Sequence, residues 1–158
     1  MSNLAYFMNS NRLPYARSFR DLLVYQKQRL LAREVFRVSK EFPPEEKYSL
    51  TDQLRRAARS IGAQIAESWA KRRYEKHFVA KLSDADAEQM ETQHWLETAK
   101  DDGYLTPDDC RRLIGLCEEI GRMLGKMMET SESFCTESTL REDQPFYFSS
   151  TPQDPPVE

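Results

Sequence analysis

A dense basic cluster, KRRYEKH, occupies residues 71–77 of the chain. Lys and Arg side chains bind phosphate oxygens, and the rings of Tyr and His can stack on unpaired bases. Two arginines further upstream lie on a helix flank away from the apolar residues. The pattern indicates a candidate nucleic-acid-binding surface, composed of Arg55, Arg59, Lys71, Arg72, Arg73, Tyr74, Lys76 and His77. The alternative is a solvated helix end whose cations keep the protein soluble or pair with acidic side chains of a neighbouring subunit.

A second candidate is the E-x-x-H segment at residues 91–94. This spacing places a carboxylate and an imidazole on one helical face, but a di-metal bundle site needs a second such segment. His77 is the only other histidine, and Tyr74 stands where its partner would be. Cys110 and Cys117 are two thiols without further ligands, which makes a poor zinc site. We therefore expect no catalytic residues, no metal and no cofactor, and a di-metal carboxylate enzyme is the weakest interpretation.

A third pattern is a row of polar residues within LTDQLRRAARSIGAQIAES, residues 50–68. Its members are three or four residues apart, so they share one helical face directly beside the apolar face. Neutral polar groups at this spacing favour hydrogen bonds made away from bulk water. The pattern indicates a candidate inter-helix or subunit interface, with an ordinary boundary face of a monomer as the alternative. Its residues are Gln53, Arg56, Ser60, Gln64 and Glu67.

Four helices are expected to carry these residues, and no segment has the alternation of a strand. The first runs from about Ser18, which forms a capping-box-like start with Asp21, to Phe42, where Pro43-Pro44 ends it. The second spans about Leu50 to Arg72.

The third helix is expected over about Glu75 to Lys100, before a stop at Gly103. The fourth follows an N-cap at Thr106 with proline at the next position. Polar residues interrupt the apolar rows of the first and third helices, namely Gln28, Gln89 and Thr92.

Long amphipathic helices with short connections pack best as an all-α, antiparallel, up-down-up-down four-helix bundle. We expect an N-terminal extension at 1–17, the bundle at 18–130 and an acidic C-terminal tail at 131–158. Both ends are expected to be at least partly disordered. The tail contains PFYF at 145–148, which either docks on a partner or has none.

The net charge of −3 conceals a strong segregation of charge along the chain. Residues 12–41 and 51–81 each hold eight Lys or Arg against three Asp or Glu, whereas residues 82–110 hold one Lys against nine acids. Such segregation can serve nucleic acid or let subunits attract one another. Three cysteines and no recognisable signal peptide favour the reducing cytoplasm, and no apolar run is long enough to cross a membrane.

The segment FPPEEKYSLTDQLRRAARSIGAQIAES at 42–68 resembles the signature of the 23S ribosomal RNA intervening-sequence protein family, also called the four helix bundle protein family. The likeness spans about residues 19–128. Matching positions are Phe42, Pro43, Glu46, Tyr48, Leu50, Gln53, Leu54, Arg55, Arg56, Ala57, Ser60, Ile61, Ile65, Ala66, Glu67, Phe78, Leu82, Ala85, Glu91, Thr92, Gln93, Leu96, 103–105 and 118–124. Departures from the family pattern are Gly62 for Pro, Gln64 for Asn, Ser68 for Gly, and Ala87-Glu88 for a small Gly-Ser pair.

The resemblance implies a small antiparallel bundle that assembles into a homopentamer without catalytic activity. Genes of this family often sit inside intervening sequences of ribosomal RNA genes. A related protein accompanies the reverse transcriptase of diversity-generating retroelements and binds that enzyme and its RNA. We therefore expect a non-enzymatic, self-assembling scaffold or accessory protein. The alternative is an RNA- or ribonucleoprotein-binding accessory protein that uses the basic residues.

Overall fold

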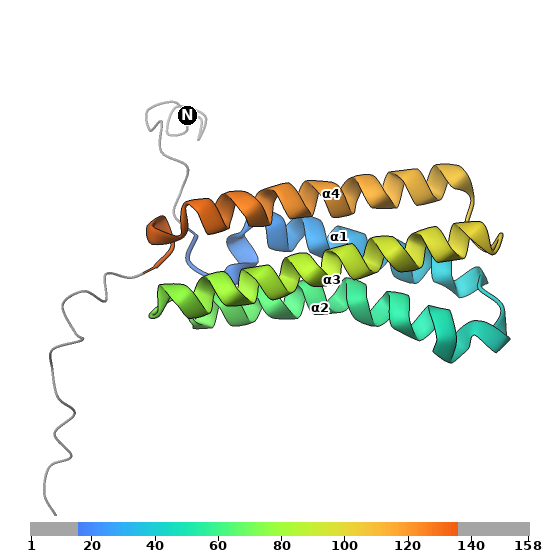
Figure 1. Ribbon diagram of the computed structural model, residues 1–158, viewed down its shortest axis with the longest axis horizontal. Helices are drawn as coiled ribbons and strands as arrows, with labels where there is room; N and C mark the ends of the chain where they lie inside the picture. Colours follow the sequence, from blue (N-terminus) through green and yellow to red (C-terminus); the bar gives the residue numbers. More distant parts are fainter. Residues whose placement is uncertain (1–15, 136–158) are drawn as a thin grey trace, which may run out of the picture.

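The computed structural model describes residues 16–135, which form an all-α four-helix bundle with no strand in this range. The helices are α1 (Leu23–Val38), α2 (Asp52–Ala70), α3 (Glu75–Asp101) and α4 (Pro107–Glu129). Figure 1 shows consecutive helices joined at alternating ends of the bundle. The expected four-helix bundle is confirmed. The PFYF segment, and most of the expected N-terminal extension and tail, lie outside the described residues.

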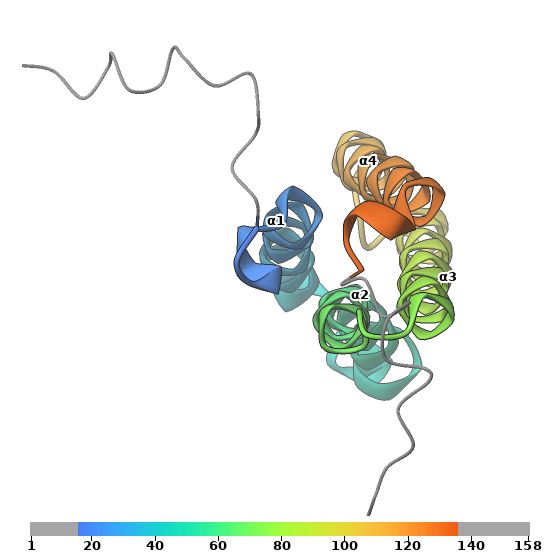
Figure 2. The same cartoon turned by 90° about the vertical axis from the view of Figure 1, so that its left-hand side faces the viewer.

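The helices enclose one core in the cyclic order α1, α2, α3, α4. Contacts join α1 to α2 and α4, and join α3 to the same two helices. Figure 2 looks along the bundle and shows α1 diagonally across from α3. The outward faces of α1 and α3 therefore point to opposite sides of the molecule.

The first helix is shorter than the sequence indicates. Ser18 and Asp21 form the expected capping box, with the Ser18 N–H donating to Asp21 Oδ2 at 3.1 Å. The box closes only a 3₁₀ turn, Phe19–Asp21, because Leu22 is extended with its side chain buried. A second 3₁₀ turn, Ser39–Glu41, tightens the other end. The helical expectation over 18–42 thus resolves into α1 between two tighter turns.

The chain enters α2 through irregular helix rather than directly. A 3₁₀ turn, Pro44–Glu46, leads into a π-helical turn, Lys47–Thr51, which continues into α2. Once α2 begins, its apolar residues recur at helical spacing and are buried: Leu54, Ala57, Ala58, Ile61 and Ile65. The start of α2 lies within two residues of the expected start.

The C-terminal end of α3 and the start of α4 lie at the signals expected from the sequence. Gly103 has a φ of +78°, a conformation that glycine adopts without steric cost. The N–H groups of Tyr104 and Leu105 then donate to the carbonyl oxygen of Ala99, at 2.8 and 3.1 Å. Thr106 caps α4 by accepting from the Asp109 N–H at 3.1 Å. This short connection turns the chain back along α3.

The polar residues that interrupt the apolar rows are buried with hydrogen-bond partners. Gln28, 2% exposed, donates from Nε2 to the Ala58 carbonyl oxygen of α2 at 2.8 Å. The buried Thr92 donates to the Glu88 carbonyl oxygen at 2.8 Å. Gln89 accepts from Gln93 at 2.7 Å. These residues belong to the core, where hydrogen bonding offsets the cost of burying them.

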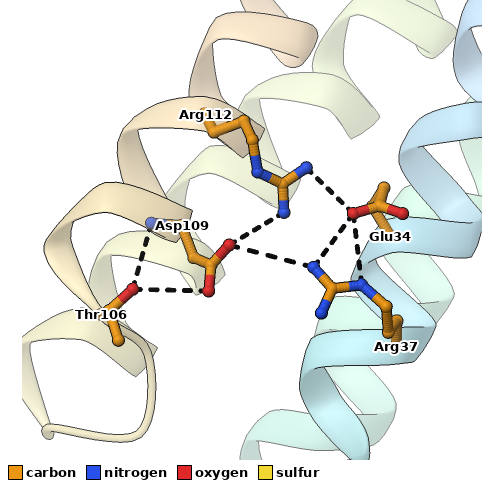
Figure 3. Close-up of polar contacts among 5 residues, drawn as sticks. All are labelled: Glu34, Arg37, Thr106, Asp109 and Arg112. Carbon is orange, nitrogen blue, oxygen red and sulfur yellow. Dashed lines mark hydrogen bonds and ion pairs between the residues drawn. The ribbon is translucent and has the colours of Figure 1, made fainter.

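An ion-pair network joins α1 to the start of α4 (Figure 3). Arg112 lies between two carboxylates, 2.9 Å from Glu34 Oε2 and 2.9 Å from Asp109 Oδ1. Arg37 pairs with Glu34 at 3.1 Å and lies 3.9 Å from Asp109. Asp109 also belongs to the N-terminal cap made by Thr106. The network thus links the helix cap to the neighbouring helix.

Candidate interaction surfaces

The polar row of α2 faces α3, and three of its five members contact that helix. Lys81 of α3 donates to Gln64 Oε1 at 3.1 Å and pairs with Glu67 at 2.8 Å. Arg56 lies 3.9 Å from Glu91 of α3. The row therefore contributes hydrogen bonds and ion pairs between helices of one bundle.

The contacts of Lys81 also shift its pKa and that of Glu67. The hydrogen bond with Glu67 raises the pKa of Lys81, and the same bond lowers the pKa of Glu67. The remaining members of the row make no such contact with α3. Gln53 accepts from Arg56 at 3.3 Å within α2, and Ser60 is half-buried. A role of the row between subunits stays a prediction.

The basic cluster at 71–77 lies at the turn between α2 and α3. Arg72 donates from Nε to the Trp69 carbonyl oxygen at 2.9 Å, and its guanidinium lies 3.5 Å from the centre of the Trp69 ring. Burial lowers the pKa of Arg72. Tyr74 and His77 contact each other with ring centres 5.4 Å apart. Arg72 is therefore partly held by the bundle, whereas Lys71, Arg73, Tyr74, Lys76 and His77 are exposed.

Arg55 and Arg59 do not join this cluster. At 1.5 Å per residue, Arg59 lies about 18 Å along α2 from Lys71. Both arginines approach the ring of Phe36 on α1 instead, with guanidinium carbons 4.8 and 5.9 Å from its centre. Arg55 also donates to Ser39 Oγ at 2.7 Å. The structure thus divides the candidate nucleic-acid-binding residues into a turn cluster (71–77) and a pair of arginines beside α1.

Of these two arginines, Arg59 lines an open groove between α1 and α2, with a volume of about 580 Å³. We call it the α1–α2 groove. Small residues form part of its lining, together with Phe36, which is 40% exposed. Three arginines line it, Arg29 and Arg33 from α1 and Arg59 from α2. In the sequence, the groove was indicated only by an aromatic residue, Phe36, among arginines on the outer flank of α1. The periodicity of the core residues does not identify this flank.

The E-x-x-H residues are engaged at the surface of α3. Glu91 accepts from Trp95 Nε1 at 3.1 Å, and the His94 ring contacts the Trp95 ring at 4.8 Å between centres. Within residues 16–135, no three His, Cys, Asp or Glu side chains gather as a possible metal site. Burial raises the pKa of Cys117 to about 12, so this thiol stays protonated at neutral pH.

No helix in the described part of the chain is long and apolar enough to cross a bilayer. The fold and the arrangement of its surfaces define a small all-α four-helix bundle with a basic groove and a polar inter-helix row. The model of the 23S rRNA-intervening sequence protein family matches residues 20–126, and the chain belongs to this family.

A solved structure supports the same placement. The chain is similar to a protein of unknown function from the S23 ribosomal protein family of Bacteroides thetaiotaomicron VPI-5482, with 27% sequence identity and a TM-score of 0.62. The match covers 68% of this chain and 99% of that one. No curated protein matches the chain. The resemblance in the sequence is therefore confirmed at the level of family and fold.

Proposed function

We propose that this protein is a non-enzymatic bundle that self-assembles, as a homopentamer, into a scaffold or accessory for another macromolecule. The family resemblance implies the pentamer, and a reverse transcriptase or its RNA is the partner class that it suggests. The observation that carries the proposal is the separation of charge between opposite sides of the bundle.

The two diagonal helices carry opposite charge. Four Lys or Arg and one Glu lie within α1, whereas α3 holds seven Asp or Glu and three Lys. Because α1 and α3 lie across the bundle from each other (Figure 2), their charges do not pair with one another, although some pair with α2 or α4, as Lys27 does with Glu119 and Glu91 with Arg56. A basic side of one copy can instead meet the acidic side of the next.

An interface between two different surfaces is heterologous, and repeating it around a closing rotation generates a ring. Such a ring would present the turn clusters of all its subunits together, and this multiplication would strengthen the binding of a weakly held partner. Such an assembly would allow a small bundle to serve as an accessory protein, because its repeated turn clusters would bind one partner together.

The mass of the purified full-length chain in solution tests the proposal. We expect light scattering at 50 mM salt to give about five times the 18.5 kDa of one chain. Raising the salt should lower that mass, since charge attraction between subunits is screened. A single-chain mass that does not change with protein concentration would refute self-assembly.

A second candidate function, RNA binding, is supported by the exposed cations of the turn cluster and by the arginines and aromatic rings of the α1–α2 groove. Phe36 has three cations around its ring, from Lys40, Arg55 and Arg59, at 4.9, 4.8 and 5.9 Å. Proteins that bind single strands combine arginines with aromatic rings in this way. The overall charge of −3 weakens the case, because it opposes attraction of a polyanion at long range.

A further inference from the structure

We propose that the α1–α2 groove receives the outward face of α3 from a second copy of the chain. The inference rests on the proposed self-assembly and names the two surfaces that make its contact. The groove supplies a basic, partly apolar recess. The α3 face supplies an acidic ridge of small side chains and one exposed methionine.

The groove has room for a helix to approach closely. Its lining includes Ala32, Ala63 and Ala66, none of which extends beyond a methyl group. Ala63 is exposed, and Phe36 leaves 40% of its surface uncovered at the edge. Packed helices lie 8–10 Å apart depending on the side chains at the contact, and short side chains allow the closer approach. The groove therefore has the form of a helix-binding site.

The outward face of α3 has a matching shape. Ala80, Ser83 and Ala87 are exposed at spacings of three and four, so they form one ridge. Met90 follows on the same side with 61% of its surface exposed. A flexible methionine fills irregular apolar recesses well. Burying it beside Phe36 would remove two large apolar side chains from water.

Charge complementarity selects this ridge as the occupant. Arg29, Arg33 and Arg59 line the groove. Asp84 and Glu91 lie within one turn of Ala87 on α3. Within the subunit, Asp84 is 3.6 Å from Lys81 and Glu91 is 3.9 Å from Arg56 of α2. Opposite charges around a small apolar contact fix the register and favour this partner over like-charged helices.

The groove lies between α1 and α2, whereas the ridge lies on α3, which is diagonally across the bundle from α1 (Figure 2). The outward face of α3 is therefore expected to reach the groove of another copy rather than that of its own subunit. Each copy can therefore offer its groove to one neighbour and its ridge to another. This arrangement is head-to-tail, and it predicts that one subunit contacts two others through different residues.

A charge-swap series tests the two surfaces. We expect Arg29→Glu with Arg33→Glu to weaken association about a hundredfold, because acids would then face acids. Asp84→Lys with Glu91→Lys should weaken it similarly. All four changes in one chain should restore the assembled mass. Circular dichroism checks that each variant keeps its helicity.

The control reverses two exposed cations of α4, Arg111→Glu and Arg122→Glu, and should leave the mass unchanged. An assembled wild type whose mass survives both the groove and the ridge reversals would overturn the proposed surfaces while leaving self-assembly intact. A monomeric wild type would overturn self-assembly itself.

Engineered cysteines provide a second, geometric test. In a Cys135→Ser background, where the other two cysteines are buried, we expect Ala63→Cys with Ala87→Cys in one chain to give a ladder of covalent multimers on oxidation. Each single variant should stay uncrosslinked, and a mixture of the two should give covalent dimers. The control pair Ala63→Cys with Gly115→Cys should give none. Crosslinking by Ala63→Cys alone, or no ladder from an assembled double variant, would contradict head-to-tail docking.

Discussion

At the scale of single residues, two buried glutamines explain the gaps in the apolar rows. Gln28 lies against Gly62 of α2, where an added Cβ would come within 2.3 Å of Gln28 Oε1. Gln89 lies against Gly121 of α4, where an added Cβ would be 3.0 Å from Gln89 Nε2. Each glutamine thus occupies space left by a glycine on the adjacent helix. The two glutamines fit at core positions because the residue facing each of them on the adjacent helix is a glycine.

We expect Gly62→Ala to lower the free energy of unfolding by about 1 kcal/mol. Alanine favours helix over glycine by about 1 kcal/mol, but displacing Gln28 breaks its bond to Ala58, and burying the unpaired groups costs about 1–3 kcal/mol. The control Gly115→Ala, with open space around the new methyl group, should instead raise stability by about 1 kcal/mol. Urea denaturation of both variants measures the difference, and equal stabilisation of the two would show that Gln28 moves freely.

At the scale of secondary-structure elements, the sequence identified all four helices and most of their ends. The cap at Thr106 and the left-handed Gly103 were predictable because each depends on local backbone chemistry. The end of the first turn at Leu22 could not be predicted, because burial of the Leu22 side chain depends on the assembled core. The π-helical turn before α2 likewise has no local sequence signal.

The pairing of α1 with α4 is expected to weaken in acid. The hydrogen bond from Arg37 lowers the pKa of Glu34, and that from Arg112 lowers the pKa of Asp109. A carboxyl whose pKa is lower in the folded state stabilises the fold above its unfolded pKa. That contribution is lost as the pH falls through the lowered folded pKa.

We therefore expect Glu34→Gln with Asp109→Asn to reduce stability by about 1 kcal/mol at pH 7, a modest effect because these ion pairs are only partly buried. The difference from wild type should shrink as the pH is lowered from 7 into the acid range, because the carboxyls of the wild type become protonated. Chemical denaturation across this range provides the measurement. A difference that persists unchanged in the acid range would mean that packing rather than charge accounts for it.

At the scale of the whole molecule, the distribution of charge matters more than the net value of −3. The described helices place basic residues on α1 and acidic residues on α3, on opposite sides. The bundle also separates Arg59, which lines the groove, from the turn cluster that follows α2. These two surfaces can therefore serve different contacts, the groove between subunits and the turn cluster toward another partner.

If the turn cluster binds RNA, titration with a structured RNA should show affinity that falls steeply with salt. Arg73→Glu with Lys76→Glu is expected to weaken binding at least about tenfold and to flatten the salt dependence, because about two phosphate contacts are lost. Both residues are exposed, unlike Arg72, which is held against Trp69. The control Arg111→Glu with Arg122→Glu on α4 should bind as wild type does. Unchanged affinity in the first pair would exclude the turn cluster as the RNA site.

The sequence by itself determined the number of helices, their core faces and the family to which the chain belongs. Helical periodicity specifies which side of each helix is apolar, and caps act within a few residues. Only the tertiary structure decided which flanks face one another. It separated Arg55 and Arg59 from the turn cluster and placed Gln64 and Glu67 against Lys81. The α1–α2 groove also emerged only from the tertiary structure, because a groove depends on how two helices pack against each other.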